Sequence, residues 1–158
     1  LDGGIHGGLD GREFGLLYNM ETNYVHGFQI AGLGNVSLGE MSGLNIAGLS
    51  NYSQGPMKGL QLSGLANISE ISMEGLQLSA GLNVNAGELS GMHIAGIANI
   101  SNDDIEGLTI AGIANVSAED QFGLIMSSVA NLSRDFMEGL ILTGGINAAK
   151  KIRRFKFI

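Results

Sequence analysis

The sequence has no cysteine and only one proline among its 158 residues. Without cysteine, the chain cannot form disulfide bonds, thiolate metal sites or a thiol nucleophile. Glycine is abundant, with 26 residues, but collagen would also need abundant proline and glycine at every third position. A disordered chain would have few apolar residues, whereas 44% of this sequence is hydrophobic. We therefore expect a folded domain.

Long apolar runs are also absent. A membrane-spanning helix needs about 18 or more consecutive apolar residues, and the uncharged stretches of this chain are interrupted by Gly, Asn and Ser. The first residues do not combine a basic segment with an apolar one, so we expect no signal peptide in this sequence.

Charge is unevenly distributed along the chain. The net charge is −7, yet five of the eight basic residues lie between Lys150 and Lys156. The rest of the chain is strongly acidic and repels phosphate groups, so nucleic acid is not an expected partner.

Two columns of residues repeat every sixteen residues without insertion or deletion. We number each repeat from its glycine as position one, which places an asparagine at position nine. The glycines are Gly11, Gly27, Gly43, Gly59, Gly75, Gly91, Gly107, Gly123 and Gly139. The asparagines are Asn19, Asn35, Asn51, Asn67, Asn83, Asn99, Asn115, Asn131 and Asn147. Such a period is typical of a solenoid.

The residues between these columns alternate as in a β-strand. Apolar residues at positions two and four flank a polar or variable residue at position three, as Leu60 and Leu62 flank Gln61. We therefore predict an all-β, single-domain β-solenoid of about nine 16-residue coils, with two short strands per coil and parallel in-register stacking. One turn is expected at positions five and six, where a glycine can adopt a positive φ. The other is expected at positions eleven to sixteen, closing at the repeating glycine.

The charged residues predict which edge of the coil faces water. From Gly27 to Asn147 every charged residue falls at positions twelve to sixteen, which is typical of a single solvated edge loop. We expect residues 1–10 to form an N-terminal cap or frayed segment, residues 11–149 the solenoid, and residues 150–158 a basic C-terminal cap or latch. The candidate cap or assembly residues are Lys150, Lys151, Arg153, Arg154, Phe155 and Phe157.

The pattern Gly-Leu-x-Ile-x-Gly-Leu-x-Asn, with Ile in place of the second Leu over residues 107–115, resembles the repeats of bacterial surface-repeat proteins. Many of those proteins are presumed lipoproteins or outer-surface proteins without known activity. The resemblance covers about residues 11–149. It implies a location at the cell surface or outside the cell and implies no reaction.

The asparagine column has two interpretations. In six repeats the asparagine begins an Asn-x-Ser glycosylation sequon. Alternatively, the side chains form a ladder of hydrogen-bonded amides. We favour the ladder, because Asn19, Asn83 and Asn147 occupy the same column without a sequon.

Residues that could carry chemistry are few. His6, His26 and His93 fall in different columns, so a histidine metal site is not expected. The acidic pairs Asp103-Asp104 and Glu119-Asp120 lack a companion base, a cleft-forming insertion or an aromatic platform for sugar. We assign no catalytic, cofactor-binding or metal-ligating residue, and weak binding of divalent cations at the acidic edge stays a secondary alternative.

These observations favour a non-enzymatic structural protein of the cell surface or extracellular matrix. We expect a rod that stacks end to end with copies of itself into a fibre, helped by an acidic N-terminal end and a basic C-terminal end. The alternative is a surface adhesin or binding module with capped ends. It would bind a surface or glycan ligand through the neutral wall of positions three and eight.

Overall fold

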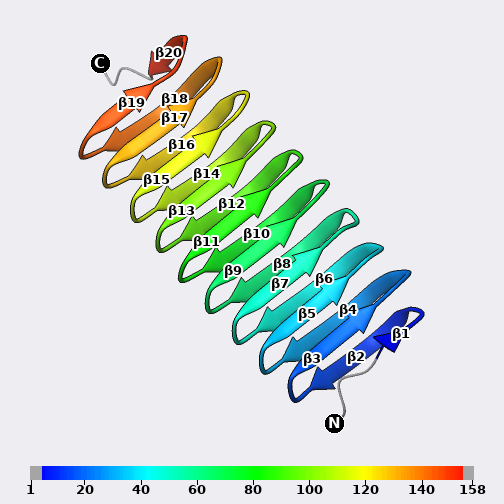
Figure 1. Cartoon of the computed structure of the whole chain (residues 1–158). Helices are drawn as coiled ribbons and strands as arrows, with labels where there is room; N and C mark the ends of the chain where they lie inside the picture. Colours follow the sequence, from blue (N-terminus) through cyan, green and yellow to red (C-terminus); the bar gives the residue numbers. More distant parts are fainter. Residues whose placement is uncertain (1–4, 155–158) are drawn as a thin grey trace.

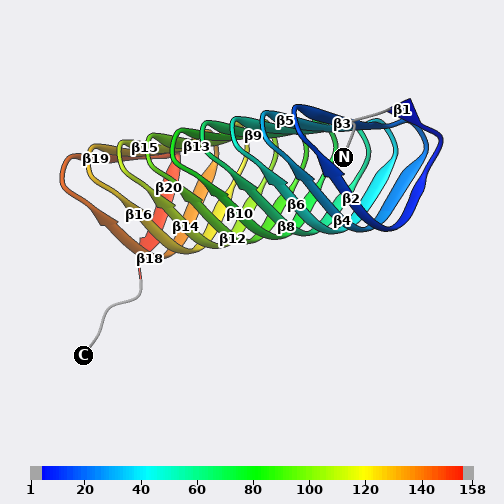
Figure 2. The same ribbon diagram turned by 90° about the horizontal axis from the view of Figure 1, so that it is seen from below.

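The chain is a β-solenoid, as the repeat predicts. In a computed structural model, residues 5–154 are described, and all regular structure among them is β-strand. Each sixteen-residue repeat makes one coil with two strands, and the coils stack into a rod with the two chain ends at opposite ends (Figure 1). In the perpendicular view, successive coils lie one behind the other with similar outlines (Figure 2).

Two parallel ten-stranded sheets form the sides of the rod. The odd-numbered strands make what we call the short-strand sheet: β1 (Ile5–His6), β3 (Tyr18–Glu21), β5 (Gly34–Ser37), β7 (Ser50–Ser53), β9 (Ala66–Ser69), β11 (Leu82–Asn85), β13 (Ala98–Ser101), β15 (Ala114–Ser117), β17 (Ala130–Ser133) and β19 (Ile146–Ala148).

The even-numbered strands make the long-strand sheet: β2 (Leu9–Gly15), β4 (Tyr24–Ala31), β6 (Glu40–Ala47), β8 (Met57–Ser63), β10 (Met73–Ser79), β12 (Leu89–Ala95), β14 (Ile105–Ala111), β16 (Gln121–Ser127), β18 (Phe136–Thr143) and β20 (Lys151–Arg154).

Strand pairing keeps equal positions of neighbouring coils side by side. Gly75, for example, lies opposite Gly59 on one side and Gly91 on the other. The two ends depart from this register: Ile5 pairs with Met20, and Ile152 pairs with Met137, so each terminal coil is one residue shorter. Strand pairing therefore extends beyond residues 11–149 at both ends. Phe155 and Phe157 lie outside the described residues.

The position-one glycines do not close a turn, as had been expected, but lie within the long strands. All nine have a positive φ, between 113° and 134°. A Cβ on Gly91 would lie 2.2 Å from the carbonyl oxygen of Gly75 in the preceding coil. Glycine is needed here both for its backbone conformation and for the space it leaves. The mid-coil glycines, such as Gly96, need only the space, because positive φ in the described chain is confined to position one.

The interior of the coil is largely polar. Positions three, five, nine, eleven and fifteen point inward, whereas positions two, four and ten point outward. In the sixth coil the residues at these inward positions are His93, Ala95, Asn99, Ser101 and Ile105, all buried, and Ala98 at position eight is buried as well. Position three, which the sequence analysis placed on the neutral outer wall, is therefore inside the rod.

A narrow apolar column runs through this polar interior. Position fifteen stacks Val25, Met41, Met57, Met73, Leu89 and Ile105. Gln121 interrupts the column in the next coil, and Ile125 at position three of the following coil is buried with Met137 instead. Ile152 of β20 packs against this second apolar group and continues it to the C-terminal end.

Replacing Gly91 by alanine should destabilise the protein by about 3 kcal/mol or more, because it combines a strained φ with a backbone clash. Chemical denaturation measures this change. Gly34→Ala is the matched control, since position eight is alanine in other coils and a Cβ there would lie 3.2 Å from the nearest atom. We expect it to cost at most about 1 kcal/mol. Equal stability of the two variants would contradict the role given to position one.

Candidate functional site

The asparagine ladder is continuous through the solenoid. In all eight steps from Asn19 to Asn147, the Nδ2 of one asparagine donates to the Oδ1 of the next at 2.8–3.0 Å. The second Nδ2 hydrogen of each asparagine up to Asn131 donates to the position-four carbonyl of the next coil at 2.7–3.3 Å. Each amide therefore ties its coil to the next and the short-strand sheet to the long-strand sheet.

This arrangement confirms the ladder and disfavours glycosylation. The column residues from Asn19 to Asn131 are at most 1% exposed. A glycan would have to be attached at Nδ2, the atom that donates both ladder bonds. The six sequons are therefore inaccessible in the folded chain.

A second polar column lies at positions three and eleven. Gln77 Nε2 donates to Gln61 Oε1 at 2.8 Å, and Gln61 Nε2 donates to Ser53 Oγ at 2.8 Å. His93 occupies the same column, between Gln77 and Thr109 on the adjacent strands, and is fully buried. Burial lowers the pKa of His93 to about 4, because the charged imidazolium loses its hydration.

The outside of the rod carries two apolar surfaces. We call the outward residues at positions two and four the long wall and those at position ten the short wall. Large apolar side chains on these walls are only partly covered: Met92 is 40% and Leu62 38% exposed on the long wall, and Leu132 is 37% exposed on the short wall. Position seven continues the apolar surface around one edge, where Leu65 is 58% exposed. The two walls and this edge together form an exposed apolar surface on the rod.

The charged residues line the opposite edge, as predicted, and the acidic pairs serve the backbone there. Asp104 Oδ1 accepts the Asp120 amide at 3.0 Å, and Asp120 Oδ1 accepts the Phe136 amide at 2.8 Å. Asp103 Oδ1 likewise accepts the Asp104 amide. Asp104 and Asp120 thus link the edge loops of successive coils, whereas the Asp103 bond lies within one loop.

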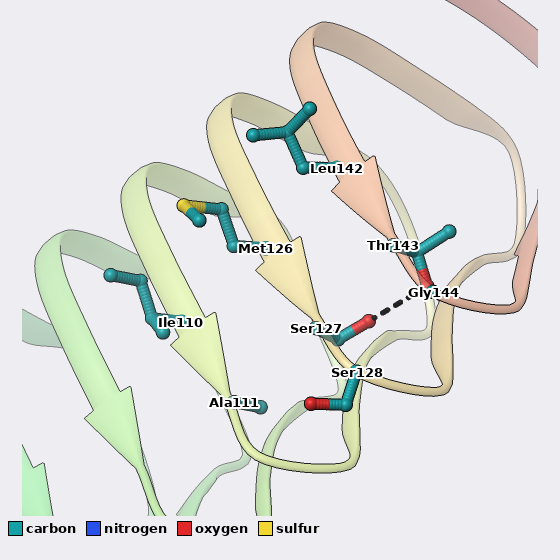
Figure 3. A pocket seen from close by; sticks show the side chains of 8 residues that line it. All are labelled: Ile110, Ala111, Met126, Ser127, Ser128, Leu142, Thr143 and Gly144. Atoms are coloured by element: carbon teal, nitrogen blue, oxygen red, sulfur yellow. Dashed lines mark hydrogen bonds between the residues drawn. The ribbon is translucent and has the colours of Figure 1, made fainter.

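A hollow of about 380 Å³ lies where the long-strand sheet turns into the mid-coil edge near the C-terminal end. Ile110, Met126 and Leu142 project from three successive strands along one side (Figure 3). Ser127 and Thr143 line its other side, with their hydroxyl oxygens 3.4 Å apart. Ser128, which lines the hollow, stands where most repeats have the mid-coil glycine; Leu16 and Ala80 replace that glycine in two other repeats.

The basic C-terminal segment binds to the preceding coil. Lys150 pairs with Asp135 and lowers the pKa of that carboxyl group through its hydrogen bond. Arg153 lies 3.5 Å from Glu138, and its guanidinium lies over the Phe136 ring at 5.7 Å. The side chain of Lys151 lies over the same ring.

The N-terminal end brings together three residues that the sequence analysis did not combine. His6 Nδ1 lies 3.0 Å from Glu13 Oε1 and 3.3 Å from Glu21 Oε1. Burial, and then the nearby Glu13 carboxyl group, raises the pKa of Glu21 to about 7. The three histidines lie in different columns, so their spacing alone does not predict this cluster. The sequence feature that indicates it is the pair Glu13 and Glu21, which stand at positions three and eleven, where the other repeats have no acidic residue.

Comparison with protein-family models, with curated proteins and with solved structures finds no match to the chain. Within the described part of the chain, no helix is long and apolar enough to cross a membrane. Function must therefore be argued from the surfaces and side-chain groups described above.

Asn83→Ala should lower the free energy of unfolding by about 3 kcal/mol, because it leaves the Asn67 donor, the Asn99 oxygen and the Ile94 carbonyl without their partner. Thermal or denaturant unfolding tests this. Asn102→Ala, at an exposed turn position, is the control and should stay within ~0.5 kcal/mol of the parent. If N83A has the same free energy of unfolding as the parent, the ladder does not contribute to stability.

Acidification should destabilise the protein through His93. Its pKa falls from 6.5 in the unfolded chain to about 4 in the folded one, so only the unfolded chain takes up a proton between these values. The folded state should lose about 3 kcal/mol as the pH falls through this interval, and regain it on return to neutral pH.

His93→Gln restores the glutamine found at position three in other coils and should remove this part of the pH dependence. Denaturant unfolding of both proteins across the interval measures the difference, while the carboxylate contributions are shared. Parallel stability curves for parent and variant would show that His93 does not titrate in this way.

Proposed function

We propose that the protein is a non-enzymatic structural rod that associates with copies of itself through its apolar walls. The observation that carries this proposal is the distribution of charge. From Gly27 to Asn147, positions one to eleven carry no charged residue, and the outward positions two, four and ten are occupied by apolar side chains. Contiguous exposed apolar surface of this extent is typical of an interaction site.

The dimensions of the walls favour association on both sides of the rod. Nine coils spaced by ~4.8 Å give a wall about 40 Å long, and four residues give a width of about 13 Å. One wall thus offers roughly 500 Å², less than the ~800 Å² that each partner usually contributes to a stable interface. Two walls reach that area, so we expect extended side-by-side assembly in preference to a closed pair.

Contacts at the C-terminal end also favour side-by-side over end-to-end association. Three of the basic side chains expected to attract an acidic neighbouring end are engaged within the chain: Lys150 by Asp135, Arg153 by Glu138 and Lys151 by the Phe136 ring. End-to-end stacking into a fibre remains the second geometry of the same proposal. The resemblance to bacterial surface-repeat proteins supports a location at the cell surface or in the extracellular matrix.

A binding module is the second candidate function. The hollow beside Met126 and Leu142 favours it, because its volume lies in the range of small-ligand sites. It combines apolar side chains with the hydroxyl groups of Ser127 and Thr143. A surface or glycan ligand would contact this hollow and the adjoining long wall, since position three is buried.

The double variant Leu62→Lys, Ile94→Lys tests self-association. Both side chains belong to the long wall and lie two coils apart, so the new charges avoid direct contact while opposing burial of the wall. The parent should assemble in sedimentation velocity, and the double variant should lose this assembly. Electron microscopy should show rods side by side in the parent.

Gln54→Lys, Asn102→Lys is the matched control, because it adds the same charge at exposed position twelve of the charged edge. It should assemble like the parent. A parent that is monomeric at all concentrations would contradict the proposal, and so would wall variants that assemble normally. If the monomer instead floats with phosphatidylcholine vesicles, the walls bind lipid and not a second copy.

A further inference from the structure

We propose that His6, Glu13 and Glu21 form a binding site for a divalent transition-metal ion, Zn²⁺ in the first place, at the N-terminal end of the solenoid. The three residues come from β1, β2 and β3, the first strands of the two sheets. One ligand atom from each lies within 4.8 Å of the other two. This inference does not depend on the proposed self-association.

The two acids occupy interior columns that are neutral in the other coils. Glu13 stands at position three, where the next coil has Gln29, and Glu21 stands at position eleven, where it has Ser37. The other coils fold with neutral residues at these two positions, so the fold itself does not explain the two carboxylates. A bound cation does, because it offsets the cost of placing two like charges inside the rod.

The Glu21 carboxylate is buried and makes no hydrogen bond within the described residues, although His6 Nδ1 lies 3.3 Å from its Oε1. Its side chain is 1% exposed, and within the described part of the chain neither Oε1 nor Oε2 has a hydrogen-bond partner. Glu13 Oε1 is also without one, whereas Glu13 Oε2 accepts a bond from Gln29 Nε2 at 3.2 Å. Gln29 thus orients one carboxylate from behind, as outer-shell residues do in metal sites.

The spacing of the ligand atoms fits an ion. Metal–ligand bonds of about 2.0–2.2 Å place neighbouring ligand atoms roughly 3 Å apart in tetrahedral or octahedral geometry. Nδ1 of His6 lies 3.0 Å from one carboxylate oxygen and 3.3 Å from the other. One imidazole and two carboxylates favour Zn²⁺ or a neighbouring first-row ion over Ca²⁺ and Mg²⁺, which prefer oxygen ligands alone. The half-exposed His6 ring leaves a path for entry and room for water ligands.

Binding would fasten the first coil. β1 pairs with β3 through only two residues, so the His6–metal bond would add a third attachment of β1 to the rod. The same ion would neutralise the end of the interior, where the polar columns have fewer neighbours. We therefore expect metal binding to raise the melting temperature.

Titration calorimetry with ZnCl₂ above neutral pH, on protein without a histidine tag, should show one saturable site per chain. Co²⁺ should compete and give visible d–d absorption bands, whereas Ca²⁺ should not compete. Glu13→Gln and Glu21→Ser should each lose the site. Both variants introduce the residue type that the same column carries in other coils, so they should fold and be at least as stable as the metal-free parent.

His26→Gln is the control for surface binding, because His26 forms an exposed pair with Asp10 at 3.3 Å in the same region. It should bind Zn²⁺ like the parent. The proposal is overturned if the parent shows no saturable Zn²⁺ binding. The cluster would then be an imidazole paired with two carboxyl groups and no metal site. It is equally overturned if E13Q and E21S retain the site or if H26Q loses it.

Discussion

In-register stacking is the constraint on which the whole structure depends. Because equal positions of neighbouring coils lie side by side, each ladder asparagine lies between two others, as Asn83 lies between Asn67 and Asn99. Asparagine suits this constraint, since its amide offers an acceptor to the coil before it and two donors to the coil after it. One donor continues the ladder and the other reaches the position-four carbonyl. A polar interior is therefore stable without a thick apolar core.

The period of the sequence was enough to predict the solenoid, its register and its charged edge. It could not show which face of the strands points inward. Alternation at positions two to four fits either orientation, and the usual rule that apolar residues lie inside fails here. Gln61 and Gln77 are buried because they bond to each other, while Leu62 is left partly outside. The turn assignment of the position-one glycine was wrong, because spacing records the need for glycine and does not distinguish a turn from a bend within a strand.

The cluster of His6, Glu13 and Glu21 could not be predicted from repeat positions, for a geometric reason. β1 joins the sheet with a terminal coil one residue shorter than the repeat, so His6 lies opposite Glu21 and not where the period would place it. A comparison by column could identify Glu13 and Glu21 as departures from their columns. It could not predict that His6 lies beside them, because the terminal coil is shorter than the repeat only in the folded structure.

The polar ladders and the apolar walls lie on opposite faces of the same strands. Asn83 and its neighbours hold the coils together from inside, while Leu62 and Ile94 face outward and are partly exposed. The uncharged apolar residues repeated at these outward positions take no part in the hydrogen-bonded ladder. An uncharged apolar surface of this kind is what the proposed self-association would require, because a second rod with the same spacing between coils would offer matching ridges.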